Sequence, residues 1–231
     1  FNPVRSTWEQ VAPMATGRTF HSASVIAGRL YVVGGVSEDT VINSVECYDP
    51  EVGTWKWLQA MSRRRHLHSA SVIKGQLYIT AGSSGIIPWQ PEDTTDTVEC
   101  YNPKTGWWAS LAPMSVGRYI HTASVIRERI YVVGGKEITW PLDSAERYDP
   151  IARRWERLAP MALPRRFHTA SVLKEKLIVA GGCGSYLPTS SVEQFDPELG
   201  VWEQLSRMTM PRMLHSATVM HGKLYILGGV K

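Results

Sequence analysis

Arginine and histidine recur together in this sequence, always in the order Arg-x-x-His. The pattern occurs five times, and its arginines are Arg18, Arg65, Arg118, Arg165 and Arg212. The histidines that complete it are His21, His68, His121, His168 and His215. Arginine is a planar, bidentate donor for carboxylate or phosphate, and histidine can act as an acid, a base or a metal ligand. The candidate chemistries are therefore anion binding, catalysis and metal binding.

Anion binding has the strongest support, because four more arginines lie close to the repeated ones without repeating themselves. These are Arg63, Arg64, Arg166 and Arg207. The short stretches that carry all nine arginines contain no acidic residue. Such a basic surface suits an acidic peptide. A solvated charge run is the alternative interpretation for Arg63–Arg65.

Catalysis has little support, since an active site should break the repeat in one place and gather acid, base or metal ligands there. Five of the seven histidines are periodic, and we interpret them as structural. The other two, His66 and His221, fall at different points of the unit and cannot converge. We find no Cys/His or carboxylate cluster with ligand spacing, no Gly-rich phosphate loop and no nucleophile elbow. We therefore expect no enzyme, no catalytic residue, no metal site and no cofactor, with a metalloenzyme as the least favoured hypothesis.

The elements that position these residues form a repeat. The stretch His21–Gly35, HSASVIAGRLYVVGG, returns four more times, and successive copies are 47, 53, 47 and 47 residues apart. The longer interval is a six-residue insertion between Gly82 and Tyr101. A fixed period of this length is typical of a repeat architecture. The predicted units lie near residues 8–54, 55–107, 108–154, 155–201 and 202–231, within a single domain over 1–231.

Each unit is predicted to contain four short strands, which we call A to D. In the first unit strand A is Ser22–Ile26, B is Leu30–Val33, C is Ser44–Tyr48 and D begins at Thr54. Side-chain size increases from strand A to strands C and D, so the sheet is a wedge, and wedges arranged around an axis close into a propeller. A tryptophan precedes each periodic histidine by 13 residues, and we expect all five to serve packing: Trp8, Trp55, Trp108, Trp155 and Trp202. The fold class is therefore an all-β propeller of four-stranded antiparallel blades.

The combined pattern of Trp, Pro-Met, Arg-x-x-His, Leu-Tyr-Val-x-Gly-Gly and Glu-x-Tyr-Asp-Pro resembles the kelch repeat across the whole chain. The phrases VECYDP and APM are most similar to the kelch-like family of BTB-BACK-kelch proteins. That resemblance implies a six-bladed propeller. Because the sequence supplies four complete blades and a partial fifth, we expect it to be a fragment that lacks the BTB and BACK regions.

Because neighbouring strands alternate in direction, the D–A and B–C loops are expected to share one face of the propeller. Three B–C loops place an aromatic residue beside proline on that face, namely Trp89, Trp140 and Tyr186. Such side chains are common interface anchors. The residues expected to contact a partner are Arg18, Phe20, Arg64, Arg65, Trp89, Arg118, Tyr119, Trp140, Arg165, Arg166, Tyr186 and Arg212.

Each set of predicted contact residues has a structural alternative. The periodic arginines can instead pair with a glutamate that recurs in strand C: Glu46, Glu99, Glu146 and Glu193. The exposed aromatic residues can fold down onto neighbouring loops. Both alternatives stay open at the level of sequence.

The resemblance implies a substrate-recognition module of a cullin-3 E3 ubiquitin ligase, engaged through the absent BTB-BACK region, with a short acidic degron as ligand. An actin-binding cytoskeletal propeller is the alternative. The net charge of +4 does not argue for nucleic acid, and the sequence contains no apolar run long enough for a membrane span. Three cysteines without ligand spacing fit a reducing compartment. We expect a cytoplasmic protein, with nuclear and cytoskeletal locations left open.

Overall fold

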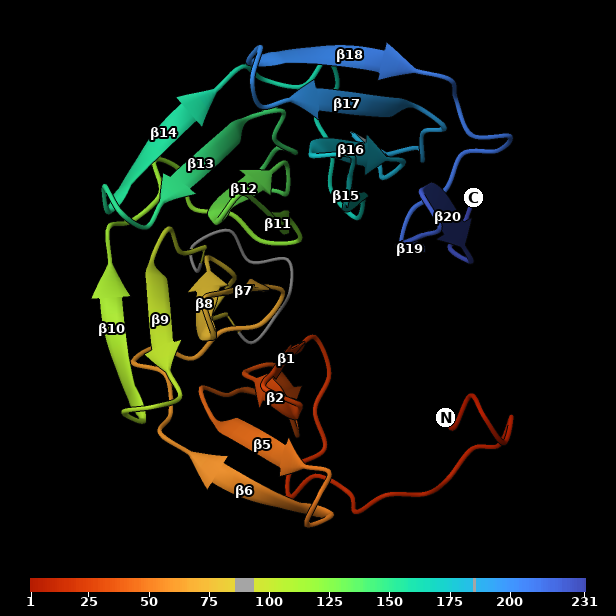
Figure 1. The fold of residues 1–231 in the computed structure, drawn as a ribbon. Coiled ribbons are helices and arrows are strands. Elements are labelled where there is room, and N and C mark those ends of the chain that lie inside the picture. The colour runs from red at the N-terminus through yellow and green to blue at the C-terminus, as the bar shows by residue number, and fades with distance from the viewer. Residues whose placement is uncertain (86–93, 185) are drawn as a thin grey trace.

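The fold is an open ring of antiparallel sheets, seen along its axis in Figure 1, with a gap between the first and the last sheet. The computed structural model describes residues 1–85, 94–184 and 186–231. Within these ranges the chain forms strands and no helix. Four sheets have four strands each, and a fifth blade consists of two strands. The prediction of an all-β propeller with four complete blades and a partial fifth is confirmed.

The strands of each blade follow one another in the order A, B, C and D. Blade 1 consists of β1 (Ser22–Ile26), β2 (Arg29–Val33), β5 (Val45–Asp49) and β6 (Thr54–Leu58). Blade 2 consists of β7 (Ser69–Ile73), β8 (Gln76–Thr80), β9 (Val98–Asn102) and β10 (Trp107–Leu111). Blade 3 consists of β11 (Thr122–Ile126), β12 (Arg129–Val133), β13 (Ala145–Asp149) and β14 (Arg154–Leu158). Blade 4 consists of β15 (Thr169–Leu173), β16 (Lys176–Ala180), β17 (Val192–Asp196) and β18 (Val201–Leu205). Blade 5 consists of β19 (Ser216–Met220) and β20 (Lys223–Leu227), and a small hairpin in blade 1 joins β3 (Val36–Ser37) to β4 (Thr40–Val41).

The hydrophobic core lies between blades, not within one. The cluster between blades 2 and 3, for example, brings Tyr78 of strand B in blade 2 into contact with Tyr148 of strand C in blade 3. Trp155 packs against Tyr148 with ring centroids 5.2 Å apart, and its indole Nε1 donates to the carbonyl oxygen of Ala112 in the preceding D–A loop. The periodic tryptophans of blades 2 to 4 therefore join each blade to the segment that follows the blade before it, and Trp55 of blade 1 bonds in the same way to Ala12.

Trp8 and His21 depart from this pattern. Trp8 is 84% exposed and contacts Phe1 at 5.4 Å, whereas the prediction made it a packing residue. His21 is also exposed. Both residues precede or begin blade 1. The equivalents of Trp8 in the other units are half-buried and those of His21 are buried, in contacts such as Trp155 with Ala112 and His168 with Thr122.

The double glycine at the end of strand B is explained by the closeness of the next blade. Gly34 has φ +60°, and a Cβ atom placed on it would lie 2.5 Å from the carbonyl oxygen of Arg65. Only glycine combines this conformation with such an approach. The next glycine, Gly35, uses its amide to donate to that same carbonyl at 2.9 Å.

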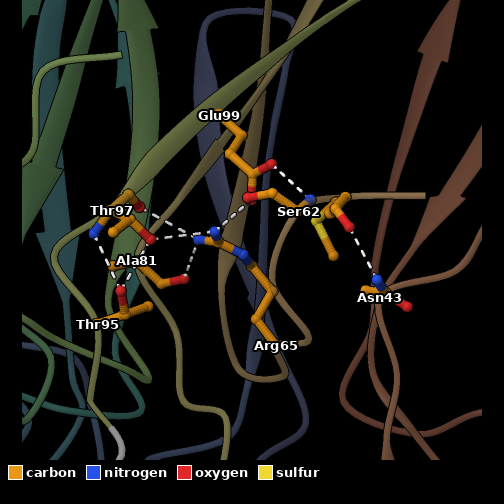
Figure 2. A network of polar contacts seen from close by, with 8 residues as sticks. Asn43, Ser62, Arg65, Ala81, Thr95, Thr97 and Glu99 are labelled. Atoms are coloured by element: carbon orange, nitrogen blue, oxygen red, sulfur yellow. Dashed lines mark hydrogen bonds and ion pairs between the residues drawn. The ribbon is translucent and has the colours of Figure 1, made fainter. Parts of the chain in front are cut away.

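The side chains of the periodic arginines of blades 1 to 4 are buried. Figure 2 shows the polar contacts of one of them, Arg65. Its guanidinium donates to Glu99 Oε1 at 2.6 Å and to the carbonyl oxygens of Ala81 and Thr97 at 2.8 and 3.2 Å. The second carboxylate oxygen of Glu99 accepts from the amide of Ser62 at 2.8 Å. One arginine therefore ties the D–A loop to the ends of strands B and C.

The same buried arginine–glutamate pair recurs in the other complete blades. Arg118 pairs with Glu146 at 2.7 Å, and the corresponding pairs are Arg18–Glu46 and Arg165–Glu193. The side chains of these arginines have no exposed surface. Such a pair is stable in the interior only because further hydrogen bonds satisfy both charged groups.

The D–A and B–C loops lie on the same face, as predicted. Short antiparallel bridges join the two loops of each blade, for example Thr19 with Val36, His66 with Ser83, and Arg166 with Cys183. The A–B and C–D turns occupy the other face, where Arg127 of one turn pairs with Glu198 of another at 2.8 Å.

Neutral histidines line the axis. Nε2 of His168 lies 3.0 Å from the hydroxyl of Thr122, the first residue of strand A in the preceding blade, and His68 makes the equivalent contact with Ser22. His121 instead contacts Thr80, at the end of strand B of the preceding blade, at 3.1 Å. Burial lowers the pKa of His168 to about 3, with the charge of Arg165 acting in the same direction. The pKa of His68 is likewise lowered to about 3.

These lowered pKa values predict acid sensitivity. The unfolded chain takes up a proton near the ordinary histidine pKa of 6.5, whereas folded His168 does not until about pH 3. The free energy of unfolding is therefore highest above pH 6.5 and falls as the pH decreases towards 3. Each such histidine should contribute a loss of about 2 kcal/mol between pH 7 and pH 5.

Urea denaturation of the wild-type chain and the His168→Gln variant across this pH range measures the effect. We expect the variant to lose about 2 kcal/mol less than the wild type. Identical pH dependence in the two proteins would show that His168 titrates normally in the folded state.

Candidate functional site

A cavity of about 380 Å³ opens at the axis of the propeller. The periodic histidines and the residue directly before each of them form its lining. These preceding residues are apolar in every blade: Phe20, Leu67, Ile120, Phe167 and Leu214. We call these five residues the apolar collar. A concave site lined mainly by apolar groups is the usual form of a ligand pocket.

The backbone of the collar is strained in the same way at all five positions. Its φ angles lie between 52° and 57°, in the left-handed region that residues other than glycine rarely adopt. Hydrogen bonds from blade to blade hold this conformation, for example from the amide of Leu67 to the carbonyl of Phe20 and from Ile120 to Leu67, both at 3.0 Å. A backbone strained in this way persists only where the surrounding structure enforces it, and such residues are frequent at binding sites.

The periodic arginines are not part of this surface. The sequence assigned Arg18, Arg65, Arg118 and Arg165 to partner contact, and the structure places their guanidinium groups in the interior, paired with strand-C glutamates. This corrects that prediction in favour of the structural alternative. The physical reason is that each guanidinium is needed to satisfy carbonyl oxygens and a carboxylate where three segments of one blade meet.

Arg212 and Tyr119 also differ from the prediction. Arg212 is half-buried and donates to the carbonyl oxygen of Gly228 at 2.7 Å, without a strand-C glutamate in its two-stranded blade. Tyr119 is only 2% exposed, and the Lys136 ammonium lies 6.0 Å from its ring centroid. A direct contact of the Tyr119 ring with a partner is therefore corrected as well.

The arginines that break the period are placed differently. Arg63 and Arg64 are exposed in the D–A loop that leads into blade 2. Arg166 is half-buried, and its guanidinium lies 5.5 Å from the ring centroid of Phe167 in the apolar collar. Positive charge at the surface of this face thus comes from positions where single units depart from the repeat.

The predicted aromatic anchors share the face with the collar. Trp140 is 70% exposed and Tyr186 is 89% exposed, each near the end of a short B–C hairpin closed by Pro141 or Pro188. The structural alternative required these side chains to fold down onto neighbouring loops, and neither of them does so. Trp89 lies outside the described residues.

The site offers little that resembles catalytic machinery. In the described ranges no group of three or more His, Cys, Asp or Glu side chains is arranged to hold a metal ion. His66, the off-period histidine of this face, is buried and its Nε2 contacts the carbonyl oxygen of Gly85 at 3.1 Å. The described chain also forms no helix with the length and hydropathy required to cross a membrane.

Sequence reasoning identified Phe20 and missed the other four members of the collar. The signal was present, because the residue before the periodic histidine is apolar in all five units. Apolar residues next to a strand are usually core, and only the positive φ turns these side chains towards the axial cavity.

Comparison with known proteins gives the family. The family model described as the KLHDC2/KLHL20/DRC7 Kelch-repeats domain matches residues 1–135 and 112–229. Kelch-like protein 24 of Rattus norvegicus is 48% identical over 137 residues, which are 58% of this chain and 22% of the relative. Kelch-like protein 30 of Homo sapiens is 44% identical over 131 residues, which are 56% of this chain and 21% of the relative. The matches therefore span about a fifth of the length of these curated relatives.

The fold is also found among solved structures. The structure of YjhT matches with a TM-score of 0.83 and 18% sequence identity, over 96% of this chain and 80% of YjhT. At this identity the match speaks for the fold alone. The family-model match over nearly the whole chain, the repeat and the similarity to kelch-like proteins together show that this chain belongs to the kelch-repeat family.

Proposed function

We propose that this propeller is a protein-interaction module that captures a short acidic peptide on the face formed by its D–A and B–C loops. By similarity to the kelch-like proteins, the peptide would be a degron, and the module would serve as the substrate-recognition part of a BTB-kelch adaptor for a cullin-3 E3 ubiquitin ligase. The activity is recognition, without chemistry on the ligand.

The observation that carries this proposal is the apolar collar. Five apolar side chains converge on one cavity of about 380 Å³, each held in a backbone conformation that costs about 1–3 kcal/mol. A requirement of folding alone would be met more cheaply by glycine at these positions. Because Phe20 and Leu214 are more than half exposed, the collar can bury an apolar side chain of a partner.

Charge around the collar supports an acidic ligand. The exposed Arg64 and the half-buried Arg166 lie in loops that lead directly into collar residues Leu67 and Phe167. Exposed Trp140 and Tyr186 extend the surface outward along the B–C loops. The arrangement fits a peptide that inserts one apolar anchor at the axis and places acidic residues over the basic loops.

The variant Ile120→Gly separates binding from folding. Glycine adopts a φ of +57° without strain, so we expect the free energy of unfolding to stay within about 1 kcal/mol of the wild type. The affinity for peptides selected from a random library displayed on phage should fall at least about tenfold, because an anchor contact is lost. Isothermal titration calorimetry with the selected peptides measures this change.

Leu199→Ala is the matched control, since Leu199 is an exposed leucine in a C–D turn on the other face. It should bind the peptides as the wild type does. Equal affinity of Ile120→Gly and wild type for every selected peptide, or a loss shared with Leu199→Ala, would remove the collar from the binding site.

The adaptor part of the proposal is tested in cells with the complete gene product that carries this chain. We expect immunoprecipitation of that protein to recover cullin-3, and the recovery to be unchanged by Ile120→Gly, because the collar would contact substrate only. Failure to recover cullin-3 under conditions in which a known BTB-kelch adaptor recovers it would refute the ligase role and leave peptide binding to be judged by the calorimetry.

A further inference from the structure

A second cavity, of about 430 Å³, lies on the same face at blade 2. It is lined by residues of the D–A loop and of the B–C loop, namely Ser62, Arg63, Arg64, Ser84 and Thr95. The described residues that line this cavity thus carry two guanidinium groups and three hydroxyl groups. We call it the arginine cavity.

Only blade 2 has this set of residues at the positions that line the arginine cavity. At the positions of Arg63 and Arg64 the other units have Thr16-Gly17, Val116-Gly117, Leu163-Pro164 and Met210-Pro211. The hydroxyls of Ser84 and Thr95 are likewise combined in no other unit, where the equivalent pairs are Ser37 and Ile42, Glu137 and Leu142, and Gly184 and Thr189. Residues that serve the repeat recur in it, so this group has no architectural reason to be present.

Buried hydrogen bonds hold the walls of the cavity in place. The Arg65–Glu99 pair fixes one wall, since Glu99 accepts from the amide of Ser62 at 2.8 Å (Figure 2). It fixes a second wall through Thr97, whose hydroxyl lies 3.1 Å from the Arg65 guanidinium and 2.8 Å from the hydroxyl of Thr95. The buried Arg65–Glu99 pair of blade 2 thus also holds residues of a surface cavity in place.

His66 fixes the third wall. Burial lowers its pKa, so the ring is neutral and its Nε2–H donates to the carbonyl oxygen of Gly85 at 3.1 Å. Its backbone exchanges two hydrogen bonds with Ser83, at 2.9 and 3.0 Å. Ser84 lies between Ser83 and Gly85, which are both hydrogen-bonded to His66. Walls that are held in place in this way lose little entropy when a ligand binds.

Among the described residues, no acidic side chain neutralises the charge of the cavity. None of the described residues that line it is acidic, and neither Arg63 nor Arg64 forms an ion pair in the described part of the chain. The carboxylate of Glu99 is committed to Arg65 and Ser62. Arg63 and Arg64 are both exposed and both line the cavity, which favours an anion there.

We propose that the arginine cavity binds the phosphate group of a phosphorylated serine or threonine in the partner peptide. This inference rests on the proposed function, because it names the chemistry of one residue of that peptide. A phosphomonoester carries a charge of about −1.5 to −2 and three acceptor oxygens. Two guanidiniums and three hydroxyls match that demand, whereas a carboxylate has two oxygens and a single charge.

Three short peptides distinguish the possible sources of the anion: acetyl-Gly-Gly-X-Gly-Gly-amide with X as phosphoserine, glutamate or serine. Inorganic phosphate and acetate serve as free ions. Binding is followed through the side-chain Nε–H signals of arginine in ¹H–¹⁵N NMR spectra. We expect saturable shifts of the Arg63 and Arg64 signals with phosphate and phosphoserine, and at least tenfold weaker binding of acetate and of the glutamate peptide.

The variant Arg64→Gln should weaken phosphoserine binding at least tenfold, whereas Arg207→Gln, at an exposed off-period arginine of another D–A loop, should leave it within twofold. Equal affinity for the glutamate and phosphoserine peptides would contradict the proposal, because the cavity would then be a general carboxylate site. Unchanged binding in Arg64→Gln, or shifts shared by all exposed arginines, would overturn it.

The two proposals can fail separately. Ile120→Gly should still bind inorganic phosphate, because the collar is not part of the arginine cavity. Loss of phosphate binding with library peptides still bound through the collar would refute this inference alone. Phosphate binding without any collar-dependent peptide would refute the proposed function.

Discussion

The buried pair between the periodic arginine and the strand-C glutamate is the interaction on which the propeller depends. The arginine side chain satisfies the ends of strands B and C of its own blade, while its backbone carbonyl accepts from a glycine of the preceding blade. The glutamate in turn holds the start of the D–A loop. A single residue pair therefore sets the position of the loop within the blade and of one blade against the next, and the aromatic residues fill the space left between them.

This division of labour explains where function can reside. Most residues that recur in every unit serve structure: the buried arginine side chains hold segments of one blade together, and the buried histidines contact the preceding blade. Recognition is left to two kinds of feature. One is the apolar collar, in which a repeated position is turned towards the axis by a strained backbone. The other is the set of departures from the repeat, of which Arg63, Arg64 and Ser84 form a preorganised cavity on the scaffold that Arg65 and Glu99 provide.

Much of the fold could be predicted from sequence, because the period aligns five copies of each strand. Strand A of the first unit was placed at Ser22–Ile26, where β1 lies, and strand C was placed within one residue of β5. The site was harder, since the same periodicity that reveals Arg65 does not show whether its guanidinium points to solvent or to Glu99. That choice depends on a contact between segments 34 residues apart within one blade. The approach of Lys136 to the Tyr119 ring and the shared cavity of Arg64 and Ser84 likewise arise only when the two loops of a blade pair.

The most direct measurement of the central claim is the free energy of unfolding of Glu146→Ala compared with Glu156→Ala. Both glutamates lie in blade 3 and pair with an arginine, but Glu146 is buried against Arg118 and Glu156 is largely exposed beside Arg147. Removing one partner of a buried pair costs about 3–5 kcal/mol, and an exposed pair contributes about 0–1 kcal/mol. We predict a loss in the first range for Glu146→Ala and in the second for Glu156→Ala. Equal, small losses in the two variants would contradict the view that the arginine–glutamate pair holds the propeller together.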